Sequence, residues 1–247
     1  MDKYGLIGFP LSHSFSKGYF GDKFKKEGIR AVYDNYELSS LDQVVPLFSD
    51  QGIKGLNVTI PYKEKIIPYL DELDETARAI GAVNVVRFVE TENGRKAVGY
   101  NSDVIGFVNS IKPYLKPCHT HALILGTGGA AKAVEYGLRC EGLQIRYVSR
   151  KADEVSGILS YEQITADLLK TYTVVVNTTP LGMYPNIEQS PAIPYEFLTD
   201  NHLLYDLIYN PSETLFMKRG KDAGAEAVNG LEMLYLQAEA AWQIWNK

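Results

Sequence analysis

The sequence predicts an α/β protein made of two domains, and three observations support that prediction. Short apolar runs alternate with helix-like segments along most of the 247 residues, as they do where helices connect the strands of a parallel, doubly wound sheet. One apolar run, 122–125, leads directly into a glycine-rich turn. Helix-breaking prolines in Lys112-Pro113 and Lys116-Pro117 separate two halves that each contain strands and helices.

The first half reads as a mixture of strands and helices. An apolar run at 3–7 predicts the first strand. In 16–27, Phe20 and Phe24 recur at helical spacing, and Gly28 ends the predicted helix. Further strands are predicted at 31–38, 55–60, 83–90 and 96–100, with a hairpin turn at Asn93-Gly94. Further helices are predicted at 40–51, 63–70 and 74–80.

The second half contains the glycine-rich turn, Gly126-Thr127-Gly128-Gly129-Ala130-Ala131. It fits the pattern G-x-G-x-x-G/A, in which Gly126 permits a tight turn, Gly128 lets a phosphate approach the backbone, and Ala131 lets helix and strand pack closely. The N–H groups that begin the following helix favour an anion. Alone the turn is common, but between a buried strand and a helix it predicts a nucleotide site in a Rossmann-like domain.

The other elements of this half agree with a doubly wound sheet. Further strands are predicted at 143–149, 173–177, 203–206 and near 227. Helices are predicted at 103–111, from the glycine turn to 141, and at 231–245. We therefore expect a first domain over residues 1–102 and a second over 103–228.

The end of the strand after the glycine turn indicates which dinucleotide binds. A carboxylate there would bind the ribose 2′-hydroxyl of NAD. Here the strand ends in Ser149-Arg150-Lys151. A guanidinium can hold a 2′-phosphate with two hydrogen bonds, so this ending favours NADP, although it can also be a solvated surface pair. Asn177-Thr178-Thr179-Pro180 follows the next strand, at the same predicted edge.

Composition excludes several classes of function. The net charge of −5 argues against a general nucleic-acid or anionic-membrane binder. Two cysteines without C-x-x-C spacing predict reduced thiols rather than a disulfide framework or a metal site. We see neither a signal peptide nor a membrane span, and expect a cytoplasmic protein.

Several polar residues of the first half stand where strands end or helices begin. They are Ser14, Ser16, Thr59, Lys63, Asn84 and Asp103. The two serines can bind a carboxylate at a helix N-terminus, or merely cap the helix. A single lysine is usually a solvated surface group, and a buried asparagine often only satisfies backbone groups. The aspartate can be an N-cap. One by one, these residues identify no function.

Eight motifs nevertheless occur in one order along the chain. In the first half they are Tyr4-Gly-Leu-Ile-Gly-Phe-Pro-x-x-His13-Ser14-x-Ser16, Asn57-Val-Thr-Ile-Pro-Tyr-Lys63, Ile80-Gly-Ala-Val-Asn84 and Gly99-Tyr-Asn-Ser-Asp103. In the second they are Gly126-x-Gly-Gly-Ala130, Asn177-x-Thr-Pro-Leu-Gly-Met183, Asp206-x-x-Tyr-Asn-Pro211 and Asn229-Gly-x-x-Met-Leu-x-x-Gln-Ala238. This set resembles the shikimate dehydrogenase family over essentially the whole chain.

The resemblance implies NADPH-dependent, reversible reduction of 3-dehydroshikimate to shikimate in aromatic amino-acid biosynthesis. It assigns the substrate carboxylate to Ser14 and Ser16, and the catalytic pair to Lys63 and Asp103. It assigns the ring hydroxyls to Thr59, Asn84, Asp103 and Gln237. It places Tyr209 and Gly230 near the nicotinamide and substrate, and NADP along Gly126–Ala131, Ser149, Arg150 and Lys151. It also implies that the C-terminal helix, 229–247, completes the first domain.

One departure from the family pattern lies beside the two serines. Lys17 replaces a proline that usually begins the helix, and it adds a positive charge near the expected carboxylate. The aspartate of the family's Asn-Thr-Asp motif is kept in Asn101-Ser-Asp103.

Two other functions stay open. A quinate/shikimate dehydrogenase would accept a related ring acid and often NAD, but the missing acidic residue after the second strand counts against NAD. A non-catalytic sensor of small molecules on the same scaffold would be expected to lose Lys63 and Asp103, and both are present. The sequence is compatible with a monomer or a homodimer.

Overall fold

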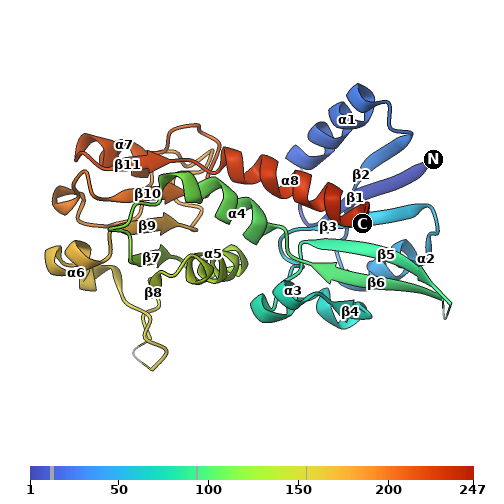
Figure 1. The fold of residues 1–247 in the computed structure, drawn as a ribbon, viewed down its shortest axis with the longest axis horizontal. Helices are drawn as coiled ribbons and strands as arrows, with labels where there is room; N and C mark the ends of the chain where they lie inside the picture. Colours follow the sequence, from blue (N-terminus) through green and yellow to red (C-terminus); the bar gives the residue numbers. More distant parts are fainter. Residues whose placement is uncertain (12–13, 93, 154) are drawn as a thin grey trace. The chain divides into compact units, whose positions relative to one another are not determined.

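The computed structural model describes residues 1–11, 14–92, 94–153 and 155–247. Within these residues the chain forms two compact units (Figure 1). The first comprises Met1–Ser102 and Ala238–Lys247, and the second comprises Asp103–Gln237. His13 of the first motif and Asn93 of the predicted hairpin turn lie outside the described residues.

The first unit is built on a mixed sheet. Its described strands number six and follow the order β2-β1-β3-β5-β6-β4. Their bounds are β1 (Asp2–Gly8), β2 (Ala31–Glu37), β3 (Ile53–Val58), β4 (Glu72–Leu73), β5 (Val85–Thr91) and β6 (Gly94–Tyr100). β1 is parallel to β2 and β3, whereas β5 is antiparallel to β3 and β6. The carboxyl ends of β1 and β3 therefore meet at one edge of the sheet.

Helices cover both faces of this sheet. On β1, Tyr4 and Leu6 share a cluster with Phe20 and Phe24 of α1 (Phe15–Glu27), while Ile7 faces the opposite cluster. That opposite cluster includes residues of α2 (Val44–Ser49) and α3 (Glu75–Ile80). The alternation along β1 is the period of two that a strand buried on both faces must have.

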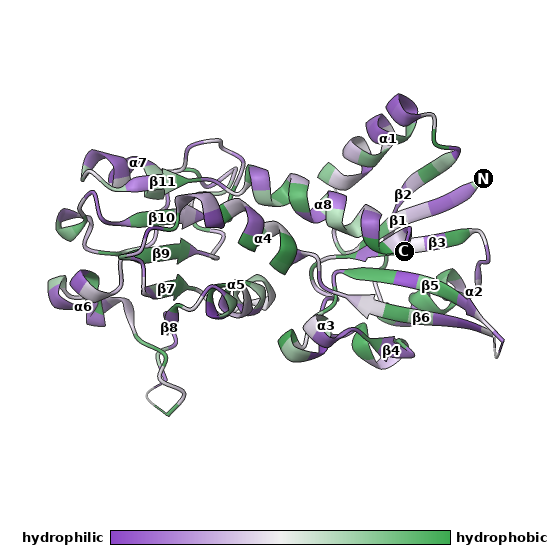
Figure 2. Cartoon of the chain, viewed as in Figure 1, coloured by the Kyte–Doolittle hydropathy of each residue, from purple (hydrophilic) through white to green (hydrophobic). Residues whose placement is uncertain are grey.

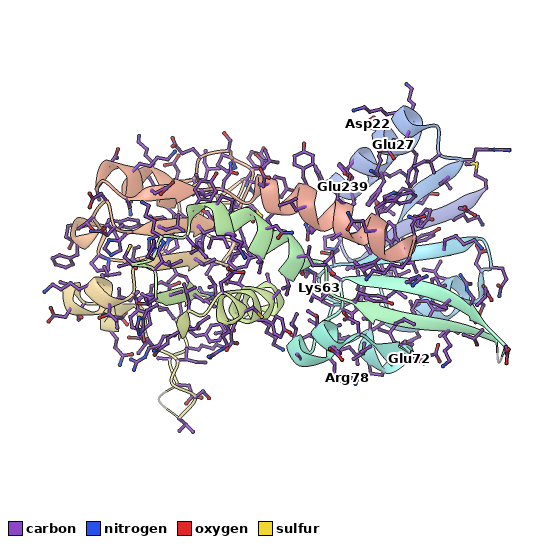
Figure 3. All side chains as sticks on the ribbon, viewed as in Figure 1. Asp22, Glu27, Lys63, Glu72, Arg78 and Glu239 are labelled. Atoms are coloured by element: carbon purple, nitrogen blue, oxygen red, sulfur yellow. The ribbon has the colours of Figure 1, made fainter. Side chains whose placement is uncertain are left out.

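The last turns of the C-terminal helix α8 (Leu231–Trp245) pack on the α1 side of the sheet. The Trp245 indole lies so close to Gly55 that a Cβ at that position would overlap the ring. Its Nε1 donates to the carbonyl of Val86 at 3.1 Å. Nearby, the Lys23 ammonium lies 2.9 Å from Glu27 and 3.0 Å from Glu239, both labelled in Figure 3. Because a Cβ would overlap the Trp245 ring, residue 55 must be glycine for this end of α8 to pack on the sheet.

The second unit confirms the predicted doubly wound sheet. Among the described residues, five parallel strands follow the order β8-β7-β9-β10-β11. Their bounds are β7 (His121–Leu125), β8 (Gln144–Val148), β9 (Val174–Asn177), β10 (Leu203–Asp206) and β11 (Glu226–Val228). β7 and β9 are coloured as strongly hydrophobic in Figure 2, as expected for strands buried on both faces.

The helices of the second unit divide between the two faces of its sheet. α4 (Asp103–Ile111), α5 (Gly129–Cys140) and Met233 of α8 pack on one face. α6 (Ala166–Thr171) and α7 (Leu215–Asp222) pack on the other. None of the described helices is both long and apolar enough to cross a membrane.

The elements differ from the sequence prediction at a few places. The helix predicted at 63–70 is wrong: this stretch holds turns and the short 3-10 helix Ile67–Tyr69, followed by β4. Pro68 cannot donate a backbone hydrogen bond and restricts the residue before it, which prevents a regular helix. Over 40–51, the 3-10 helix Leu41–Gln43 precedes the shorter α2. α6 and α7 were not predicted, although threonine caps begin both.

The contact between Gly55 and Trp245 predicts opposite effects for two glycine-to-alanine changes. Gly55→Ala should lower the free energy of unfolding by about 1–3 kcal/mol, because the added methyl group overpacks the indole. Gly21→Ala, in α1, has no described atom within 4 Å of its new Cβ, and should raise it by about 0.5–1 kcal/mol. Urea unfolding of both variants checks this, and equal effects would contradict it.

Candidate functional site

The carboxyl edge of the second sheet gathers most of the predicted cofactor-binding residues. β7 lies between β8 and β9, and both neighbours run parallel to it. The helix that follows β7 packs on one face, whereas α6, which precedes β9, packs on the other. Ligands of open α/β sheets bind where the chain switches faces in this way. The end of β7 is that point in this unit.

Gly126, directly after β7, has a φ of +104°, a conformation that favours glycine. A Cβ there would stand 2.8 Å from Oγ1 of Thr178. Thr178 follows β9, and its N–H and hydroxyl both donate to the carbonyl of Leu125, at 3.0 and 2.7 Å. Gly126 itself donates to the carbonyl of Val148 at 2.8 Å. The turn is thus held by the strands on both sides.

The beginning of α5 is shaped to receive a phosphate. Gly128 is the N-cap, and as a glycine it places no side chain over the first N–H groups of the helix. No described atom lies within 4 Å of where its Cβ would be. Thr127 and Gly128 are exposed, whereas Ala131 is buried between helix and sheet. An open helix N-terminus of this kind fits an anionic group.

The end of β8 carries two cationic side chains. Arg150 and Lys151 are both exposed, and the N–H of Lys151 donates to the hydroxyl of Ser149 at 3.2 Å. Burial raises the pKa of Tyr161, and the charge of Arg150 opposes that rise. Since β8 pairs with β7, the two cations stand one strand away from the glycine turn. The residues present fit a dinucleotide with a phosphate on its ribose.

A buried carboxylate, Asp206, lies at the end of β10 on the same edge. It accepts hydrogen bonds from Asn177 Nδ2 at 3.0 Å and from the Thr214 hydroxyl at 2.6 Å. Burial raises its pKa to about 6, against the opposing effect of these donors. Tyr209 is 39% exposed, and Gly230 donates its N–H to the carbonyl of Ile208 at 3.1 Å. The sequence prediction gave Asp206 no role, although the residue begins one of the eight motifs.

Two helices of the second unit carry the remaining predicted residues. Asp103 is buried and is the first residue of α4. Gly106, one turn later, approaches α8 closely: a Cβ there would lie 2.6 Å from the Met233 carbonyl and 3.0 Å from Cβ of Gln237. Asp103 and Gln237 therefore lie on helices that pack against each other.

In the first unit, the predicted substrate residues gather at the carboxyl ends of β1 and β3. The N–H of Thr59 donates to the carbonyl of Ile7 at 2.8 Å, and that of Val83 to the carbonyl of Lys63 (Figure 3) at 2.7 Å. The Asn84 side chain binds Ser102, with its Nδ2 3.0 Å from the Ser102 hydroxyl and its Oδ1 2.6 Å from the N–H. Ser102 immediately precedes Asp103.

The two serines at the start of α1 have different partners. The Ser14 hydroxyl oxygen accepts from the N–H of Lys17 at 3.4 Å, so Ser14 caps the helix. The Ser16 hydroxyl bonds to Tyr33, whose pKa is raised by burial. Tyr33 in turn donates to Oδ1 of Asn57 at 2.8 Å. Neither Tyr33 nor Asn57 was assigned a role from the sequence, although Asn57 begins the second motif.

The predicted site residues therefore divide between the two units. Ser14, Ser16, Thr59, Lys63 and Asn84 belong to the first unit. The cofactor residues, Asp103, Tyr209 and Gln237 belong to the second. The pairing of Lys63 with Asp103 stays a prediction.

Known proteins resemble the chain along its length. Residues 6–86 match the model of the shikimate dehydrogenase substrate binding domain. The shikimate dehydrogenase (NADP(+)) of Desulforamulus reducens is 36% identical, over 98% of this chain and 88% of its own. A solved shikimate dehydrogenase in complex with NADP+ has a TM-score of 0.88 at 33% identity, over 99% of this chain and 90% of its own. A quinate dehydrogenase from Corynebacterium glutamicum in complex with NAD has a TM-score of 0.85 at 28% identity, over 99% and 93%.

The raised pKa of Asp206 predicts a pH-dependent stability. It lies near 6 in the folded protein, whereas an unfolded aspartate titrates near ~3.9. As pH falls, the folded state therefore binds this proton before the unfolded state does, and this stabilises the folded protein. The stabilisation is lost as pH rises through 6. When the pH is lowered from 7.5 to 5.0, the free energy of unfolding of the wild type should rise by roughly 1–1.5 kcal/mol relative to that of Asp206→Asn, as measured by urea unfolding. A difference between the two proteins that is the same at both pH values would contradict this.

Proposed function

The chain belongs to the shikimate dehydrogenase family, and on that premise we propose that it catalyses the reversible, NADP-dependent reduction of 3-dehydroshikimate to shikimate. The observation that carries the proposal is the carboxyl edge of the second sheet. There the turn at Gly126 follows β7, and the cations Arg150 and Lys151 follow the neighbouring strand β8. Such an edge suits a dinucleotide with a 2′-phosphate. The nature of the substrate follows from the family.

The two parts of the chain have separate tasks in this proposal. Residues 1–102 form the substrate-binding and catalytic domain, completed by the C-terminal helix 229–247, of which Ala238–Lys247 belong to the first unit. Residues 103–228 form the NADP-binding domain. The substrate side chains are Ser14, Ser16, Thr59, Lys63, Asn84, Asp103, Tyr209 and Gln237. NADP is bound along Gly126–Ala131, by Ser149, Arg150 and Lys151, and beside Thr178 and Gly230.

The protein itself has to bind the acid and move one proton. When bound, the nicotinamide supplies the hydride chemistry. In the direction of reduction, the protonated Lys63 donates to the developing alkoxide oxygen, and in the reverse direction it takes that proton back. Asp103 is its partner in the proposed catalytic pair, and the two groups handle the proton as a coupled unit. Ser14 and Ser16 fix the carboxylate, with the helix N-terminus of α1 adding its partial positive charge.

A spectrophotometric assay tests the proposal directly. Shikimate with NADP should give rapid reduction of the cofactor, and shikimate with NAD a much slower one. Faster turnover of quinate with NAD would establish the quinate/shikimate dehydrogenase alternative instead. Binding of shikimate without any cofactor reduction would point to the sensor.

We also propose a cytoplasmic location and a monomeric or homodimeric state. Cys118 and Cys140 are exposed free thiols in the structure, and exposed thiols persist best in a reducing compartment. Sedimentation velocity distinguishes the two oligomeric states.

The proposed proton transfer predicts a large effect at one of two neighbouring lysines. Lys63→Ala should lower kcat by roughly 10²-fold or more, the range for lost acid–base catalysis, while the Kd for NADP+ stays near the wild-type value. Lys65→Ala, at an exposed position two residues later, is the matched control and should keep wild-type turnover. Near-normal kcat in Lys63→Ala would remove Lys63 from this role.

The proposed 2′-phosphate contact predicts a change of cofactor preference. Arg150→Asp should sharply reduce the use of NADPH and improve the use of NADH, because a carboxylate repels the phosphate and can accept from a ribose hydroxyl. Arg146→Asp makes the same change of charge at an exposed position of β8 and should leave the preference alone. If kcat/KM for the two cofactors keeps its ratio in Arg150→Asp, the phosphate is bound elsewhere.

A further inference from the structure

Asp206 links two loops of the carboxyl edge through hydrogen bonds to both of its carboxylate oxygens. Oδ1 accepts from Asn177 Nδ2 at 3.0 Å and from the N–H of Ile208 at 3.1 Å. Oδ2 accepts from the Thr214 hydroxyl at 2.6 Å. Asn177 ends β9, while Ile208 and Thr214 belong to the connection between β10 and α7. One side chain thus fastens the segments that leave two neighbouring strands.

Asn177 extends this connection toward the glycine turn. Its Oδ1 accepts from the N–H of Thr179 at 3.0 Å and from the Thr179 hydroxyl at 2.7 Å. Thr179 lies against the turn, because a Cβ on Gly126 would be 3.1 Å from its methyl carbon. A continuous chain of hydrogen bonds and contacts therefore runs from Asp206 through Asn177 to the turn.

The same carboxylate also reaches the segments that carry Tyr209 and Gly230. Ile208, held by Asp206, is the residue before Tyr209, and its carbonyl accepts from the N–H of Gly230 at 3.1 Å. The proposed function places Thr178 and Gly230 beside NADP and Tyr209 at the substrate. All three adjoin groups that Asp206 holds in place.

The arrangement calls for a carboxylate rather than for any polar side chain. Asp206 is fully buried, and the described groups that approach its oxygens are all donors: an amide NH₂, a backbone N–H and a hydroxyl. An ionised carboxylate accepts all of them, whereas an asparagine has one acceptor oxygen and would turn its own NH₂ toward another donor. Burying such an unsatisfied group distorts or loosens the segments around it.

We propose that Asp206 is a positioning residue for the cofactor-binding edge: its ionised side chain holds the segments after β9 and β10 in the arrangement that binds NADP. This inference rests on the proposed function for the identity of the cofactor. Asp206 is buried beneath these segments and acts through Asn177, Ile208 and Thr214.

The state of ionisation gives this role a signature. Burial raises the pKa of Asp206 to about 6, so the carboxylate is ionised at pH 7.5 and largely protonated at pH 5.0. Among the described residues, Tyr195 is a titratable group whose pKa the charge of Asp206 affects. Burial raises the pKa of Tyr195 to about 12, so it stays neutral in this range. The affinity for NADP+ should then fall as Asp206 takes up its proton.

Calorimetric titration with NADP+ tests the proposal. At pH 7.5, Asp206→Asn should raise the Kd roughly tenfold or more, because a buried donor left unsatisfied disturbs the segments that bind the cofactor. At pH 5.0, the wild-type Kd should approach that of the variant. The phosphate of NADP+ also titrates near pH ~6, but it does so with both proteins and cancels in their ratio. A ratio near one at pH 7.5, with the wild type binding normally, overturns the inference.

Two controls separate positioning from general stability. Tyr205→Phe removes a neighbouring buried hydroxyl that lies 2.6 Å from the Ser110 hydroxyl, and should lower stability without changing the Kd. Thr214→Val removes one donor to Asp206 and should raise the Kd, whereas Thr214→Ser keeps that donor and should restore it. If Tyr205→Phe weakens NADP+ as much as Asp206→Asn does, Asp206 is merely structural. A wild type that binds NADP+ but does not oxidise shikimate fails the proposed function and leaves this test intact.

Discussion

The carbonyl oxygen of Leu125 is the acceptor on which the cofactor edge depends. It ends β7 and receives two hydrogen bonds from Thr178, which begins the segment after β9. A buried carbonyl at a strand end needs such partners, because leaving it unpaired costs about 1–3 kcal/mol. The pair of bonds brings Thr178 so close to Gly126 that a side chain there would collide with it. The glycine at position 126 and the position of Thr178 are therefore consequences of one contact.

The C-terminal helix imposes the second constraint. Met233 belongs to the core of the second unit, whereas Ala238, Ala241 and Trp245 belong to a core of the first. The first unit therefore lacks part of its hydrophobic core until the final residues of the chain are in place. Position 55, almost two hundred residues earlier, must be glycine because the Trp245 ring leaves no room for a Cβ. Closing a core across such a sequence separation costs more loop entropy than forming a local contact does.

How far the sequence predicts this molecule depends on how local each feature is. The apolar strand 122–125 and the glycine turn carry their signals within a dozen residues, and the structure agrees with them. The helix predicted at 63–70 is wrong because apolar spacing outweighed Pro68, a strictly local obstacle. Asp206 was missed for a different reason. Its partner Asn177 is 29 residues away, and only the pairing of β9 with β10 brings them together. In the same way, sequence motifs alone did not link Tyr33 to Ser16.

The start of α1 shows why a structural role and a binding role need not compete. Ser14 accepts from the N–H of Lys17 through its oxygen, so its hydroxyl proton can still be donated to an anion. Lys17 changes the net charge near the start of α1 less than its own charge suggests. Its ammonium lies 3.1 Å from Asp34, and both side chains are about half exposed. The pair is neutral as a whole and screened by solvent. If a carboxylate binds at this helix as proposed, its attraction comes mainly from the helix N-terminus and the two hydroxyls, because Asp34 offsets the charge that Lys17 adds.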